Sequence, residues 1–176
     1  MKTLEPYKNF NNIIQIIFEK SPLQKKKILS FISKQNNEYF VQAENFSKNY
    51  AAYLKKQNIP LQYAINSYLK MCNNMVASQI FFFKEKKYPN KNAQLALEKV
   101  YSNEEEMKQY MIGLAISQFL WSTHYEMYLF LLQNIWKYRT SIKKYLEIGP
   151  GHGLFLTEAI KILGNGLYFS AVYISK

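Results

Sequence analysis

The residues best suited to chemistry lie at 145–156, which read Tyr-Leu-Glu-Ile-Gly-Pro-Gly-His-Gly-Leu-Phe-Leu. The opening residues are mostly apolar, which predicts a short parallel strand buried on both faces. Gly149, Gly151 and Gly153 then allow a sharp turn and let a ligand approach the backbone closely. Apolar residues follow at helical spacing over 154–163, so we expect a helix to begin at the glycines. Its first N–H groups have no partner within the helix and are available to a ligand.

Two classes of cofactor bind at loops of this kind. A dinucleotide fingerprint has the form G-x-G-x-x-G, with an acid about 20 residues later. Counted from Gly149, its third glycine falls on Leu154, so the sequence disfavours a dinucleotide. The loop contains no lysine that could bind phosphate, and Glu147 precedes the first glycine by two residues. The alternative to cofactor binding of either class is a glycine-rich turn that holds no ligand.

The pattern Glu147-x-Gly149-x-Gly151-x-Gly153 resembles motif I of the class I S-adenosylmethionine-dependent methyltransferases. The resemblance covers about residues 144–175. It implies a Rossmann-like β-α-β unit whose loop wraps the methionine end of S-adenosylmethionine, with Glu147 helping to hold the ammonium group. The cofactor-binding residues that it implies are Glu147, Gly149, Pro150, Gly151, His152, Gly153 and Tyr173.

Tyr173 marks a departure from that family. Residues 163–166 predict a helix stop and turn, and residues 168–175 predict a second strand. In the family, an acid at the end of that strand binds the ribose hydroxyls, and the matching position here is Tyr173. A tyrosine hydroxyl makes one such hydrogen bond but cannot accept from two vicinal hydroxyls as a carboxylate does. The substitution therefore bears on cofactor affinity.

Methyl transfer is an in-line displacement in which the protein mainly aligns donor and acceptor. A general base is needed only where the acceptor must lose a proton. The candidates are His124, Tyr125 and Glu126, which precede the predicted strand; the alternative is an interhelix polar pair in the core. His152 lies inside the loop, where we expect its backbone N–H rather than its ring to contribute.

Composition limits the other function classes. The net charge of +11 invites nucleic-acid binding, but Arg139 is the only arginine, and the planar fork of arginine is favoured for phosphate and base recognition. Cys72 is the only cysteine and there are only two histidines, so the sequence shows no cluster of metal ligands. The first residues, with Glu5 and Pro6, have no apolar core of a signal peptide. We therefore expect a cytoplasmic protein without a metal site.

Residues 1–140 predict a region of several helices. Ser21 followed by Pro22 predicts a helix start, and Ser102 followed by Glu104 and Glu105 predicts a capping box. The helices are expected over 6–20, 22–34, 37–57, 60–87 and 91–101, then from 102, and finally from Ser122 or Thr123 to about 138.

Residues 109–136 are apolar enough to suggest either a membrane span or a buried core. They contain Gln118, His124 and Glu126, and the apolar parts on either side are shorter than the roughly 18 residues of a membrane span. A buried helical hairpin is expected instead. The aromatic residues at 81–83 and 128–136 are expected in the core.

The fold prediction is a mainly α protein with a helical lid or dimerisation region at 1–140 and an incomplete Rossmann-like β-α-β unit at 141–176. The expected function is methyl transfer from S-adenosylmethionine to a small molecule or glycan precursor. Since the family's sheet has about seven strands, this part alone is expected to be inactive. Its expected partners are a complementing C-terminal half or a second copy. The alternatives are a non-catalytic helical interaction protein with a degenerate loop, and a basic nucleic-acid-binding protein.

Overall fold

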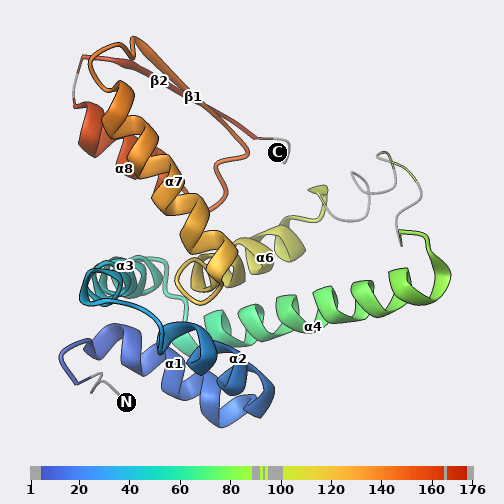
Figure 1. Ribbon diagram of the computed structural model, residues 1–176. Helices are drawn as coiled ribbons and strands as arrows, with labels where there is room; N and C mark the ends of the chain where they lie inside the picture. The colour runs from blue at the N-terminus through green and yellow to red at the C-terminus, as the bar shows by residue number, and fades with distance from the viewer. Residues whose placement is uncertain (1–4, 89–91, 93, 95–100, 165, 174–176) are drawn as a thin grey trace.

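The structure is a computed structural model that describes residues 5–88, 92, 94, 101–164 and 166–173. It is mainly helical, and a small parallel sheet lies near the C-terminal end (Figure 1). The elements of the described parts are α1 (Lys8–Lys20), α2 (Pro22–Ile32), α3 (Asn37–Lys56), α4 (Leu61–Glu85), α6 (Glu104–Ser117), α7 (Ser122–Tyr138), β1 (Lys144–Ile148), α8 (Leu154–Leu163) and β2 (Tyr168–Val172).

Side-chain N-caps set the starts of α2 and α3. The hydroxyl of Ser21 accepts a hydrogen bond from the backbone N–H of Gln24 at 3.4 Å, which confirms the predicted start of α2. The side chain of Asn36 accepts one from the N–H of Tyr39 at 3.0 Å and begins α3. Each cap satisfies an N–H group that has no partner inside its helix.

The cap of α6 lies one residue later than predicted. The N-cap is Asn103 rather than Ser102, and its side-chain oxygen accepts from the N–H of Glu106 at 3.1 Å. Asparagine is as good an N-cap as serine, so the local sequence alone did not decide between them. The three acids Glu104–Glu106 occupy the first turn, where the helix dipole favours negative charge.

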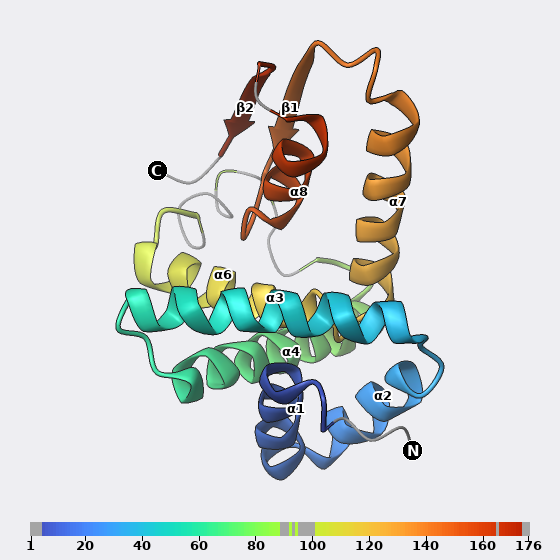
Figure 2. The same ribbon diagram turned by 90° about the vertical axis from the view of Figure 1, so that its left-hand side faces the viewer.

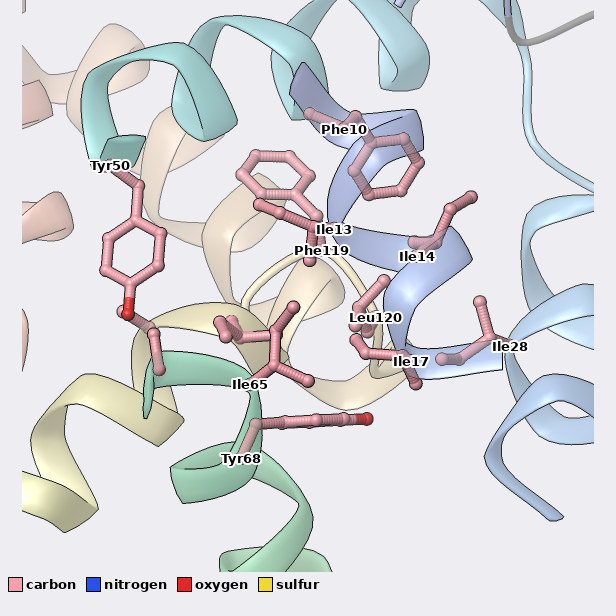
Figure 3. Packing of buried hydrophobic residues seen from close by; sticks show 14 of the residues in the cluster. Phe10, Ile13, Ile14, Ile17, Ile28, Tyr50, Ile65, Tyr68, Phe119 and Leu120 are labelled. Carbon is pink, nitrogen blue, oxygen red and sulfur yellow. The ribbon is translucent and has the colours of Figure 1, made fainter. Parts of the chain in front are cut away.

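One apolar core joins the helices of the body. Figure 3 shows Ile14 and Ile17 of α1 meeting Ile28 of α2 and Ile65 of α4. Phe119, from the turn between α6 and α7, completes this cluster and is 2% exposed. Burying each such side chain contributes about 1.5–3 kcal/mol relative to leaving it in water. The helical body is therefore held mainly by its apolar faces.

Buried tyrosines connect α3 to the α6–α7 region. The hydroxyl of Tyr50 donates to the carbonyl of Ile112 at 2.8 Å, and that of Tyr39 donates to the carbonyl of Phe119. Burial raises the pKa of both tyrosines, with a smaller contribution from a neighbouring tyrosine in each case. The hydroxyls therefore remain protonated donors.

Helices α4 and α6 approach each other closely at Gly113. A Cβ atom at Gly113 would lie 2.8 Å from the carbonyl carbon of Ser67 and from the backbone nitrogen of Tyr68. Real Cβ atoms do not come so near to backbone, so only glycine fits this crossing. This contact fixes the position of α6 against α4.

The C-terminal part forms a parallel strand pair with α8 as its crossover helix (Figure 2). Lys144 lies opposite Tyr168 and Ile148 opposite Val172, which confirms the predicted parallel pairing. The prediction of a strand covered on both faces is wrong. Burial alternates along β1, and Leu146 and Ile148 are 60% and 74% exposed, because only one face of the sheet is covered.

The predicted burial of two aromatic groups is only partly correct. Tyr128 is buried, and Phe82 is half-buried. In Figure 1 the second half of α4 extends past α6 and away from the other labelled helices, so among the described elements no helix covers the side chains there. The aromatic residues of these groups that are exposed instead are Phe81, Phe83, Phe130 and Trp136.

In the described ranges, no helix combines the length and apolar character needed to cross a membrane. The helix predicted over 91–101 falls almost entirely on residues outside those ranges, as does the end of the strand predicted over 168–175. Where it is described, that strand ends at Val172.

Candidate functional site

The glycine loop, residues 149–153, connects β1 to α8. The N–H of Gly149 donates to the carbonyl of Val172 at 2.8 Å and continues the pairing with β2. The three glycines have φ angles of +67°, +57° and +78°, which side chains rarely allow. The N–H of Gly153 donates to the carbonyl of Pro150 at 2.9 Å, and α8 begins at the next residue. The predicted strand, turn and helix are confirmed.

The loop has an open side and a packed side. Cβ atoms placed on Gly149 and Gly153 would meet nothing within 4 Å. One placed on Gly151 would lie 3.6 Å from the side chain of Met111 and 3.7 Å from that of Leu114, both in α6. The middle of the loop therefore rests on the helical body, while space remains beside its first and last glycines.

A cavity of about 640 Å³ lies where α3 and α6 meet the loop and α8. From the loop it is lined by Gly151 and His152. Phe46, Tyr50 and Phe119 form an aromatic wall on the helical side. The helical region thus packs directly onto the glycine loop, and the junction leaves space for a small ligand.

The polar lining of the cavity comes mostly from residues that the sequence analysis missed. Gln42, Asn45 and Asn49 lie three and four positions apart on α3, so they share one face of the helix. Lys108 of α6 adds a positive charge, whereas Lys161 of α8 is paired at 2.7 Å with Glu158, which also lines the cavity. The helical spacing of the three carboxamides was a usable signal, but many of this chain's helices carry asparagine, and only the fold shows which ones face the loop.

The ring of His152 is part of the cavity wall. It lies edge-on to Phe46 with 5.9 Å between ring centroids, and its Nδ1 accepts from the N–H of Leu154 at 3.4 Å. Burial, with a smaller contribution from His124, lowers the pKa of His152 to about 4. The ring is therefore neutral at pH 7 and carries its proton on Nε2. The expectation that only its backbone N–H would contribute left out these ring contacts.

Glu147 and Tyr173 lie outside the cavity lining. The Glu147 carboxylate is half-buried on β1, and the hydroxyl of Tyr145 donates to its Oε2 at 3.0 Å. Burial raises the pKa of Glu147, and this hydrogen bond opposes the rise. Tyr173 follows β2 and is 57% exposed. Glu147 therefore presents a partly desolvated carboxyl group next to the loop.

The three candidate catalytic residues do not converge. Nδ1 of His124 lies 2.8 Å from the hydroxyl of Ser117, and burial lowers the His124 pKa. The hydroxyl of Tyr125 donates to Oε1 of Gln42 at 2.9 Å, so its role is an interhelix contact, the alternative considered from the sequence. Glu126 is exposed. None of the three lines the cavity beside the loop.

Across the described ranges, no group of three or more His, Cys, Asp or Glu side chains could hold a metal ion. No family model, curated protein or solved structure matches the chain. The assignment of a function therefore depends on the residues and geometry of the loop and the cavity.

Proposed function

We propose that the chain carries the S-adenosylmethionine site of a class I methyltransferase acting on a small molecule or a glycan precursor. In this proposal residues 144–173 are the first β-α-β unit of a Rossmann-like sheet. The observation that carries it is the loop 149–153. Three glycines with positive φ follow a parallel strand and precede a helix, and the middle one, Gly151, lines a cavity of about 640 Å³ together with His152.

The residues present fit this cofactor. The space beside Gly149 and Gly153 leaves room for a ligand against the backbone. The loop would wrap the methionine end, and the carboxylate of Glu147 would hold the ammonium group. Tyr173 would supply one hydrogen bond to the ribose where the family has an acid.

The charge beside the loop favours a cationic group over a phosphate. The half-buried carboxyl of Glu147 has a raised pKa because water solvates its charge poorly. An ammonium group beside it would restore that lost stabilisation. A phosphate would instead meet a second negative charge, and the loop has no lysine to offset it.

When bound, the cofactor supplies an electrophilic methyl group on its sulfonium. The contribution of the chain is to position the acceptor, and the cavity between α3, α6 and α8 is the place for it. Nδ1 of His152 already accepts the N–H of Leu154, and its pKa near 4 keeps the ring neutral. His152 therefore holds the acceptor through Nε2–H rather than removing a proton.

The test is calorimetric titration of the chain with S-adenosylmethionine. We expect Glu147→Gln to weaken binding by roughly tenfold or more, because a hydrogen bond to a charged group contributes about 1.5–3 kcal/mol. Glu126→Gln, which removes an exposed carboxylate on α7, is the matched control and should leave affinity unchanged.

Two results would count against the proposal. Absence of any heat of binding, or equal affinity in wild type and Glu147→Gln, would favour the non-catalytic helical interaction protein. Tight, sequence-selective DNA binding in fluorescence anisotropy would favour the basic nucleic-acid-binding alternative.

A further inference from the structure

The C-terminal half of α4 is an exposed apolar extension. Cys72 is the last buried residue of the helix, and every position from 73 to 88 except the half-buried Phe82 is exposed. We call residues 73–88 the α4 arm. Its helical part is about 20 Å long at a rise of 1.5 Å per residue, and it projects away from the other helices in Figure 1. No charged residue occurs in it before Lys84.

Apolar side chains surround the end of the arm. Ile80 is 62% exposed, Phe83 is 70% exposed and Tyr88 is 74% exposed. Successive helical residues point about 100° apart, so the run from Ile80 to Phe83 covers nearly all sides of the helix. A groove on a partner protein covers one helix face and would leave the other side chains in water. A lipid interface surrounds the whole end of an inserted helix.

Positive charge is concentrated at the same end. Lys84, Lys86 and Lys87 lie there beside the single acid Glu85, in a chain of net charge +11. The Nζ atom of Lys86 lies 5.6 Å from the ring centroid of Phe83, so an ammonium group sits directly against the exposed aromatic surface. Aromatic rings bounded by lysines match the boundary between acyl chains and anionic headgroups.

The charges also argue against a parallel pair of arms as the occupant. Parallel pairing of two arms would place the terminal lysines of one copy against those of the other, whereas an anionic surface complements them. Lys70, which lies just before the arm, already pairs with Glu106 at 3.0 Å and adds no repulsion to an antiparallel pair. Light scattering distinguishes an antiparallel pair from a membrane anchor.

We propose that the α4 arm is a peripheral membrane anchor that inserts its tip into an anionic lipid bilayer. Ile80, Phe81 and Phe83 enter the boundary with the acyl chains, while Lys84 and Lys87 remain at the headgroup phosphates. The arm is shorter than the roughly 20 residues that a span requires, so it anchors at the surface. This inference is independent of the proposed cofactor site.

Vesicle flotation of the full chain tests the anchor. We expect the chain to float with vesicles of phosphatidylcholine and phosphatidylglycerol, and to stay behind with phosphatidylcholine alone. Lys84→Gln/Lys87→Gln should weaken binding about thirtyfold, from the contribution of each lysine near an anionic surface. Phe81→Gln/Phe83→Gln should abolish flotation at high salt, where charge attraction is screened.

The matched controls make the same changes elsewhere. Lys26→Gln/Lys34→Gln removes two exposed charges near α2, and Phe130→Gln/Trp136→Gln removes two exposed rings of α7. Both should float as the wild type does. The proposal is overturned if the wild type fails to float, or if controls and arm variants lose binding equally. It is also overturned if the arm variants change only the oligomeric mass in light scattering, since the occupant would then be a second copy.

Discussion

The backbone N–H of Leu154 donates to Nδ1 of His152 across 3.4 Å, so the loop histidine caps the first residue of α8. This contact assigns the proton of the neutral ring to Nε2. Phe46, from the opposite side of the cavity, packs against the same ring. The loop, the start of α8 and α3 are therefore linked through a single side chain.

The half-buried ring of His152 should make stability depend on pH. In the unfolded chain a histidine has a pKa near 6.5, whereas that of His152 is lowered to about 4 in the fold. Protonation therefore favours unfolding. The free energy of unfolding should fall as the pH drops from about 6.5 to about 4, by up to about 3 kcal/mol. His152→Phe keeps a ring against Phe46 and should flatten the curve in denaturant titrations. An unchanged slope in that variant would show that His152 is not desolvated.

Filling the open side of the loop should block cofactor binding without unfolding the protein. Gly149→Asn suits this test because asparagine tolerates the left-handed conformation at φ +67°. We expect little change in melting temperature and loss of measurable S-adenosylmethionine binding by calorimetry. Asn58→Gly, an exchange at another left-handed position, is the control. Unchanged affinity in Gly149→Asn would show that the ligand does not use this space. Gly151→Val is less informative, because its side chain would press on α6.

Restoring an acid after β2 should strengthen cofactor binding. Tyr173 is 57% exposed, so Tyr173→Asp disturbs no packed side chain. A carboxylate that accepts from two ribose hydroxyls contributes about 1.5–3 kcal/mol, or roughly ten- to hundredfold in affinity. Calorimetry of both proteins with S-adenosylmethionine measures this directly. Tyr173→Phe is the control and should not gain affinity. A similar gain from both variants would mean that the tyrosine merely obstructs the site.

The crossing of α4 and α6 should reject even one added methyl group. Helix propensity alone predicts that Gly113→Ala stabilises the protein by about 1 kcal/mol. The new Cβ would instead lie 2.8 Å from backbone atoms of Ser67 and Tyr68. We expect a net destabilisation of about 1–3 kcal/mol, measured by urea unfolding. Because propensity and clash have opposite signs, a more stable variant would rule out the close approach.

Features encoded by neighbouring residues could be predicted from the sequence. Ser21 and Asn36 cap helices because a side-chain oxygen three residues before a free N–H reaches it. The glycine loop and its flanking strand and helix were predicted because only glycine adopts three positive φ angles at low cost. Parallel pairing of β1 and β2 followed from the single crossover helix between them.

Features that depend on distant segments could not be predicted. Phe81 and Phe83 are as apolar as the core phenylalanines, but they are exposed because α4 extends beyond the other described helices. Tyr125 reads as a candidate base, and only the packing of α7 on α3 shows that its hydroxyl is committed to Gln42. The cavity lining joins segments far apart in the chain, and no local pattern reports their distance in space.

The uncovered face of the sheet makes protein concentration an experimental variable. Leu146, Ile148, Tyr168 and Val172 are all more than half exposed, and among the described strands β2 pairs only with β1. An apolar face beside a free strand edge is a template for another chain to add to. At high protein concentration, copies of the chain therefore associate through this face, and that association adds its own heat and mass to the measurements. Titrations and flotation should be done at low protein concentration, with light scattering to measure the oligomeric state.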